Sequence, residues 1–256
     1  GRYVTLRGMA GGLNAVSMNG ALVPSPEGGR KVLLDGLPTE LLDSIEVYKT
    51  LTPNQDLEGI GGRIEFNTKK ATALEEPVLK FRYDTQYNEY SKSGNNPKYS
   101  LTYGDKITEN FGAIFGYTFQ SKDIVSNNNE VGYEPWAVDS NGNKYLARDW
   151  EMRFYDLTRE REGMTIDMDF EYSPNTSFFV NYLFNEYVDD EIRHKDEYRA
   201  RNVVESSITS TSAAYQRITA DKETRKRIET RQIKTQIVGG ETNLGDLNFK
   251  FQASNS

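Results

Sequence analysis

The 256-residue chain has no cysteine and a single histidine, His194. Disulfides, thiolate metal sites and cysteine nucleophiles are therefore excluded, which leaves the cellular compartment open. His194 lies among charged residues, where a lone imidazole favours a solvated side chain over a metal ligand or a general base, and no Ser-His-Asp arrangement can be assembled. We therefore predict no catalytic residue, no metal site and no cofactor, and a protein that is not an enzyme.

Long apolar runs are missing as well. No stretch approaches the roughly 18 consecutive apolar residues that a membrane-spanning helix needs, so helical membrane proteins are excluded. The first residues, Gly1–Val4, lack the basic region and apolar core of a signal peptide. Because the sequence opens inside a predicted strand, we expect it to be a fragment of a longer protein.

Basic residues are fewer than acidic ones. The 31 Lys and Arg against 38 Asp and Glu give a net charge of −7, which disfavours a nucleic-acid partner because such a partner requires a basic face. The basic run Lys222–Arg231 is interpreted as loop or strand surface. The chain is rich in rings, with 16 Tyr and 12 Phe, although its mean hydropathy is −0.70. A polar but ring-rich composition is typical of a transmembrane β-barrel, in which alternate residues face lipid and aromatic girdles mark the interfaces.

The first 75 residues combine short strands with turn signals. Asn19-Gly20 accepts positive φ at both positions and predicts a type I′ hairpin within Val16–Val23. Pro38 predicts the first position of a short helix, Pro38–Asp43. Other strands are predicted at Tyr3–Arg7, Val32–Leu34, Ile45–Tyr48 and Ile64–Asn67. The segment is predicted to be a small mixed α+β unit, in which Arg63 either pairs with a carboxylate of a neighbouring wall or is solvated.

Four segments of this unit resemble the latter half of the plug domain of TonB-dependent outer-membrane receptors. They are RGM, NAVSMNGALVPSP, LDGLPTELLDSIEVYKT and GIGGRIEFNTK. In that family a motif similar to Ser44–Val47 precedes a Gly-Gly pair, like Gly61-Gly62, and a last plug strand. The KTLTPNQDLEG stretch is closer to the branch associated with uptake of carbohydrate or other large ligands than to the branch with a GP-x-x-x-LYG pattern. The resemblance covers Tyr3 to about Ala71.

Seven stretches of period-two alternation follow, which favours strands over helices. The first and last alternating apolar residues of each stretch bound the ranges Leu79–Tyr87, Tyr99–Tyr103, Phe111–Phe119, Met164–Tyr172, Phe178–Phe184, Ile233–Ile237 and Leu247–Ala253. We predict an α+β plug segment at residues 1–75 and the first part of an antiparallel transmembrane β-barrel at residues 76–256. The barrel is predicted to be incomplete, because plugged barrels have about 22 strands.

Connection lengths test this prediction, since outer-membrane barrels alternate short periplasmic turns with longer extracellular loops. The predicted periplasmic turns are Gly104–Asn110, Ser173–Thr176 and Thr242–Gly245. The predicted outward connections are Ser91–Pro97, Lys122 to about Asp149, and about His194 to Arg225. Facing outward from the barrel, Phe115 is predicted to contact lipid.

Two groups of outer residues have side chains that suit ligand chemistry. Asp189–Glu191 is interpreted as a solvated extracellular rim rather than a glycosidase pair, because nothing places a second carboxylate opposite it. Trp136 and Trp150 are interpreted as membrane-interface anchors or packed loop residues, with sugar stacking as the alternative.

The resemblance implies a receptor in the outer membrane of a Gram-negative bacterium that imports a nutrient, with energy from the TonB complex acting through a segment outside this sequence. The ligand would be an oligosaccharide, a siderophore or another small molecule. The plug apices predict ligand contacts at Met9, Asn14, Pro24, Ser25, Glu27 and Arg30. Two alternatives remain: a passive porin-like barrel, and a soluble secreted β-sandwich that binds or hydrolyses sugars.

Overall fold

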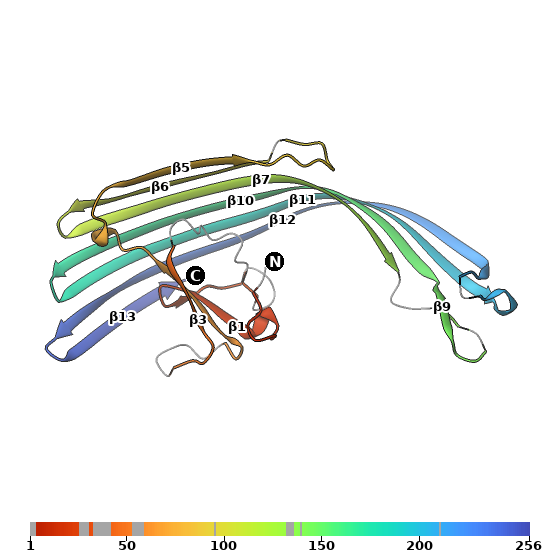
Figure 1. Cartoon of the computed structure of the whole chain (residues 1–256), viewed down its shortest axis with the longest axis horizontal. Helices are drawn as coiled ribbons and strands as arrows, with labels where there is room; N and C mark the ends of the chain where they lie inside the picture. Colours follow the sequence, from red (N-terminus) through yellow and green to blue (C-terminus); the bar gives the residue numbers. More distant parts are fainter. Residues whose placement is uncertain are drawn as a thin grey trace.

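Two β-sheets dominate the computed structural model, which describes residues 4–25, 31–32, 42–52, 59–94, 96–131, 136–138, 140–209 and 211–256. A seven-stranded antiparallel sheet, here called the wall, runs in the order β13-β12-β11-β10-β7-β6-β5. A four-stranded sheet in the order β2-β1-β4-β3, here called the small sheet, lies against one face of the wall (Figure 1). That face is called the inner face, and the opposite one the outer face. None of the described residues forms a helix long and apolar enough to cross a membrane.

The wall is a simple meander in which each strand pairs with its neighbours in the chain. Its strands are β5 (Val78–Thr85), β6 (Pro97–Thr108), β7 (Phe111–Val131), β10 (Asp149–Ser173), β11 (Thr176–Val204), β12 (Ala214–Leu244) and β13 (Leu247–Asn255). The prediction of seven strands is confirmed. Two residues join β6 to β7, β10 to β11 and β12 to β13, so the three predicted short turns are confirmed too. The wall is open, with β5 and β13 at its edges.

Two long outward connections were predicted, from Lys122 to about Asp149 and from about His194 to Arg225, and both predictions are wrong for most residues, which lie in strands. β10, β11 and β12 contain 25, 29 and 31 residues and extend far beyond the small sheet (Figure 1). The residues predicted as loops continue the backbone pairing of the strands, because their charged side chains form ion pairs with those of neighbouring strands. Arg193, for example, forms an ion pair with Glu223 at 2.5 Å. A separate hairpin of β8 (Trp136–Val138) and β9 (Lys144–Ala147) joins β7 to β10, and Trp150 stacks on Tyr198 beside it.

The small sheet is built from β1 (Asn14–Met18), β2 (Ala21–Leu22), β3 (Leu42–Tyr48) and β4 (Gly62–Thr68). β1 pairs in parallel with β4, and β3 pairs antiparallel with the other edge of β4. The strands predicted at residues 45–48 and 64–67 are confirmed. So is the Asn19-Gly20 turn, where φ is +47° and +85°.

Two local predictions in this region are wrong. Residues 4–8 form a bend and a turn instead of a strand, because Arg7 and Gly8 both adopt positive φ, at +55° and +74°. The helix predicted at Pro38–Asp43 does not reach its end, since Leu42 and Asp43 begin β3. The remainder of that helix and residues 33–34 of the predicted strand lie outside the described residues. Short 3₁₀ turns within the described residues include η1 (Gly11–Leu13), η3 (Ala71–Ala73) and η4 (Glu205–Ser207).

The two faces of the wall differ in chemistry. On the outer face, large apolar side chains are left uncovered, with Phe81 70% exposed. On the inner face, polar side chains such as Thr165 alternate with apolar ones that the small sheet covers, and Leu183 is 1% exposed. Ile233 and Ile237, which the sequence placed with the outward apolar set, point inward and are buried. Their alternation predicted that they share a face, and packing decides which face it is.

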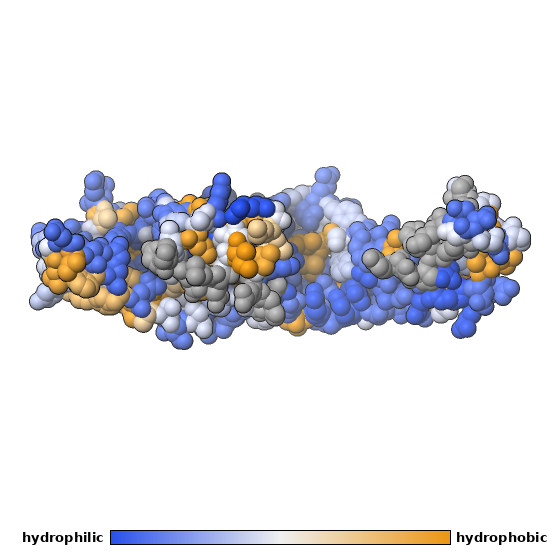
Figure 2. Space-filling view, turned by 90° about the horizontal axis from the view of Figure 1, so that it is seen from below, coloured by the Kyte–Doolittle hydropathy of each residue, from blue (hydrophilic) through white to orange (hydrophobic). Residues whose placement is uncertain are grey.

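Hydropathy also changes along the length of the wall. Seen from below, apolar side chains gather toward the end with the short turns and over the small sheet, and the extended end is mainly hydrophilic (Figure 2). On β10 the outer face carries Met164, Ile166, Met168, Phe170 and Tyr172, and beyond Met164 its next outward residue is Glu162. The outer apolar band therefore ends near Glu162.

Candidate functional site between the small sheet and the wall

The contact between the small sheet and the wall has an apolar centre. Val16, Met18, Ile64 and Phe66 of the small sheet share one buried cluster with two inner-face residues of the wall. Those two residues are Leu183 and Ile233. The alternation of β1 and β4 places these side chains on one face of the small sheet, so the sheet has a single apolar side to bury. This burial docks the small sheet on the wall.

Polar contacts surround that centre on β10. The Thr68 hydroxyl donates to Asp167 Oδ1 at 3.1 Å, and the Asn181 amide donates to the same oxygen at 2.5 Å. Asp169 lies two residues after Asp167 on β10, and its Oδ2 accepts a hydrogen bond from the backbone N–H of Ala71 at 2.6 Å. Two inward carboxylates of the wall thus hold the end of β4 and the segment after it. Water can replace such hydrogen bonds when the surfaces separate, so their net contribution is small compared with apolar burial.

A glycine of the wall receives the segment that leaves the small sheet. A Cβ at Gly112 would lie 2.6 Å from the backbone carbon of Ala71 and 2.8 Å from its Cβ. Ala71 is fully buried and packs with Ile114 and Leu74. Residue 112 therefore lacks a side chain where the chain passes from the small sheet to β5, and any larger residue would push the two apart.

A buried ion pair fixes the hairpin of the small sheet. Arg63 Nη2 lies 2.9 Å from Glu65 Oε2, and Arg63 Nε donates to Ser17 Oγ at 2.6 Å. The Ser17 hydroxyl also hydrogen-bonds Glu65. Glu65 Oε1 accepts the N–H of Gly20 at 2.6 Å, and Arg63 donates to the Gly20 carbonyl at 3.0 Å. Both predicted environments of Arg63 are wrong, because it is buried and its carboxylate partner is two residues along its own strand.

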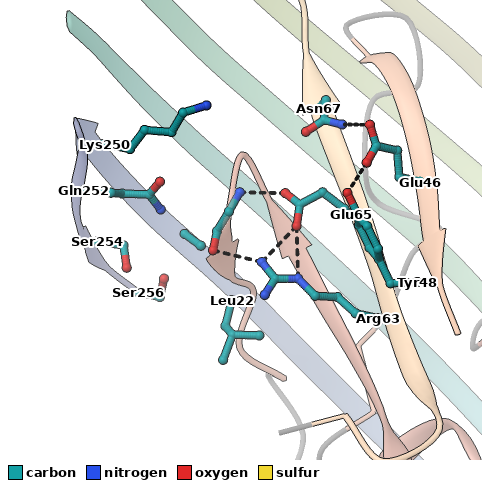
Figure 3. Close-up of a pocket in the computed structure, with 12 residues that line it drawn as sticks. Leu22, Glu46, Tyr48, Arg63, Glu65, Asn67, Lys250, Gln252, Ser254 and Ser256 are labelled. Atoms are coloured by element: carbon teal, nitrogen blue, oxygen red, sulfur yellow. Dashed lines mark hydrogen bonds and ion pairs between the residues drawn. The ribbon is translucent and has the colours of Figure 1, made fainter. Parts of the chain in front are cut away.

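An open cleft of about 870 Å³ lies between this ion pair and β13. Lys250, Gln252, Ser254 and Ser256 line one side, and the Arg63–Glu65 network faces them across the cleft (Figure 3). The Gln252 amide spans the two sides; with its oxygen and nitrogen exchanged, it donates to the Asn19 carbonyl at 3.0 Å and accepts the Ala21 N–H at 3.2 Å. The cleft is polar and can hold hydrogen-bonding ligands or water.

Tyr48 and Glu46 form the far rim of the cleft. The Tyr48 hydroxyl hydrogen-bonds the Glu46 carboxylate, and this bond raises the pKa of Tyr48 above its usual value of 10.0. Glu46 in turn accepts from the Asn67 amide at 3.1 Å. The rim therefore presents the Tyr48 hydroxyl and the Glu46 side chain next to each other.

The residues predicted to contact a ligand are scattered. Asn14 is buried and donates to the Val4 carbonyl at 3.0 Å, and Met9 is half-buried in the turn before η1. Pro24 is exposed, and the Ser25 hydroxyl donates to the Lys31 carbonyl at 2.7 Å. Glu27 and Arg30 lie outside the described residues. None of the four described residues lines the cleft, and their ligand contacts stay predictions.

Two acidic residues predicted as a solvated rim are buried instead. Asp189 and Glu191 are each 5% exposed on the inner face. Asp189 Oδ1 lies 2.7 Å from Arg159 Nε, and Glu191 forms ion pairs with Arg225 and Arg227 at 2.7 and 3.2 Å. The prediction of exposure is wrong because arginines on both neighbouring strands cover these carboxylates.

No protein-family model and no curated protein matches the chain. Solved structures do resemble it. The FrpB iron transporter from Neisseria meningitidis aligns at 13% identity and a TM-score of 0.39, over 99% of this chain and 43% of that one. The outer membrane transporter YddB from Escherichia coli aligns at 12% identity and a TM-score of 0.34, over 98% and 50%. The siderophore receptor PirA from Acinetobacter baumannii aligns at 14% identity and a TM-score of 0.38, over 98% and 40%.

The chain therefore spans half or less of the length of these three neighbours. Two of the three are transporters and the third is a siderophore receptor.

Proposed function

We propose that the chain is part of an outer-membrane transporter, in which the wall is a section of the barrel and the small sheet is the plug inside it. One observation carries the proposal: a single wall is apolar on the outer face and has a folded sheet docked on the polar inner face. Such a wall suits lipid on one side and a plugged lumen on the other. We place the boundary between plug and barrel near residue 75.

The alternatives fit this arrangement less well. A passive porin has a water-filled lumen, whereas here Leu183 and Ile233 of the inner face are buried under the small sheet. A β-sandwich buries the facing surfaces of two sheets, whereas here the outer-face side chains Phe81, Tyr83 and Phe251 are more than half exposed. Removing those rings from water requires lipid or another apolar partner.

The mechanism we propose is gating without covalent chemistry. A ligand binds above the small sheet, and the TonB complex then drives displacement or remodelling of that sheet. The hydrogen bonds from Thr68 and Ala71 to Asp167 and Asp169 would be exchanged for water as the sheet moves. The imported ligand would be a small nutrient such as an oligosaccharide or a siderophore.

A cross-link across the contact tests the gate, and no native cysteine of this chain competes with the introduced pair. Thr68→Cys with Asp167→Cys replaces two side chains whose oxygens are 3.1 Å apart. As a control, Thr176→Cys with Thr242→Cys joins two wall strands, at hydroxyls 2.8 Å apart. The assay measures the ion conductance of the whole protein inserted in planar lipid bilayers. Moderate urea should loosen the plug and so raise this conductance.

We expect a short thiol cross-linker to suppress this conductance in the first pair and to leave it unchanged in the control pair. Equal conductance in both cross-linked pairs would show that the small sheet does not block the lumen. Failure of the whole protein to insert into bilayers, or to change its electrophoretic mobility on heating in detergent, would overturn the barrel itself.

A further inference from the structure

Five arginines gather on the inner face of the wall just beyond the small sheet. They are Arg159 and Arg161 of β10 and Arg225, Arg227 and Arg231 of β12, and together they are called the arginine cluster. Strand register places them in adjacent rows across β11, with Arg161 opposite Tyr187 and Tyr187 opposite Arg231. Since residues two apart on a strand share a face, all five point to the same side as the buried Leu183.

Tyr187 is the centre of the cluster. Its ring lies 5.3 Å from the Arg231 Cζ, 5.4 Å from the Arg159 Cζ and 5.7 Å from the Arg161 Cζ. The side chain is 3% exposed, and its hydroxyl donates to Asp189 at 2.7 Å. The ring thus holds guanidinium groups from both neighbouring strands in cation–π contact, which fixes their positions at low entropic cost.

The carboxylates around the cluster do not balance it. Three face it on the same side: Asp189, Glu191 and Glu229. Five guanidinium groups therefore stand against three carboxylates, and Lys122 of β7 lies opposite Arg159 in register. This excess of positive charge occurs in a chain whose net charge is −7. Like charges held together in a partly dehydrated place raise the local potential and attract anions.

A ladder of internal ion pairs is the simpler explanation for inward arginines, but it would pair each guanidinium with a carboxylate. Here Glu191 is shared by Arg225 and Arg227, and Glu229 is shared by Arg227 and Arg231. The Nε of Arg225 is buried without a hydrogen-bond partner among the described residues. Arg225 therefore keeps a donor that the carboxylate beside it does not use.

We infer that the arginine cluster binds an anionic ligand that carries two or more carboxylate or phosphate groups. The planar guanidinium fork matches both groups in bidentate geometry, and five forks on two strands, β10 and β12, suit a ligand with several such groups. The inference rests on the proposed function in one respect, since that function places the cluster in the lumen above the plug. It adds the chemical class of ligand, which the plug apices do not indicate.

Binding to the detergent-solubilised whole protein tests the inference by calorimetry with two probes, tripolyphosphate and the tricarboxylate tricarballylate. Arg231→Gln and Arg227→Gln each remove one fork. We expect the affinity of either variant to fall about 10- to 100-fold, the usual effect of losing a charged hydrogen bond. Lys226→Gln is the matched control, because it removes the same charge from the same strand on the outer face. There we expect a change of less than about twofold.

Arg227→Lys keeps the charge but loses the fork, and its affinity should lie between those of the wild type and Arg227→Gln. Unchanged heat-dependent mobility shows that each variant is folded. Saturable binding of either probe with this pattern of losses supports the inference. Equal losses in Lys226→Gln and Arg231→Gln, or no saturable binding of either probe to the wild type, overturns it. The binding assay involves no transport, so its failure is distinct from failure of bilayer insertion.

Discussion

Replacement of Phe115 by arginine offers a direct test of what covers the outer face. In register, Phe115 lies between Tyr103 of β6 and Ile166 of β10. It is the middle one of five outward side chains on β7 that run from Phe111 to Phe119. At about 3.3 Å per residue, roughly 13 Å of strand separates it from either end of that run. If the outer face lies in lipid, Phe115 is near the depth at which a charge is most costly.

The expected magnitude depends on depth. An arginine facing lipid costs about 2–4 kcal/mol at the bilayer midplane and about 0–1 kcal/mol near an interface. Phe119 is paired with Glu162, and the Tyr117 hydroxyl donates to that carboxylate at 2.9 Å, so this end of the run already meets polar groups. We therefore expect Phe115→Arg to lower the free energy of unfolding by about 2–4 kcal/mol and Phe119→Arg to lower it by about 1 kcal/mol or less.

Urea titration of the whole protein folding into lipid vesicles measures both values, and Phe115→Leu serves as an apolar control. The difference between the two arginine variants is informative because both add the same charge to the same face of one strand. Equal costs for the two, or stability of Phe115→Arg equal to that of Phe115→Leu, would refute a lipid-covered outer face.

Three further outcomes follow from the small sheet. Gly112→Val should displace Ala71 and destabilise the docked sheet by about 1–3 kcal/mol, which proteolysis of the segment after β4 will detect. Glu65→Gln should cost about 3–5 kcal/mol, because it leaves a buried arginine uncompensated, and urea unfolding of the small sheet measures this loss. Glu46→Ala removes the hydrogen bond that raises the pKa of Tyr48, so an NMR titration should show that pKa falling toward 10.0; an unchanged value would reject this cause.

Much of the wall could be predicted from alternation alone. Side chains on a strand have a period of two, and the runs from Phe111 to Phe119 and from Met164 to Tyr172 keep that period without a break. The Asn19-Gly20 turn was equally predictable, because only a few residue types tolerate positive φ at both positions.

The interior of the site could not be predicted in the same way. Alternation shows that Ile233 and Ile237 share a face, but only the packing of Ile233 with Leu183 and the small sheet shows that the face is inner. Asp189 and Glu191 have the sequence signature of a solvated rim, and their burial depends on arginines from other strands. Such pairings between distant segments leave no local signal in hydropathy.

Both faces of the wall change in chemistry at the same level along β10, near residues 161–164. There the outer face changes from apolar to polar, and the inner face changes from contacts with the small sheet to the arginine cluster. On β10 the last outward apolar residue is Met164, the next outward residue is Glu162, and Arg161 beside it points inward into the arginine cluster. Below this height the inner face docks the small sheet through Leu183 and Asp167. If the wall and the small sheet are barrel and plug, as proposed, an anion held by the cluster would rest inside the lumen, directly above the plug.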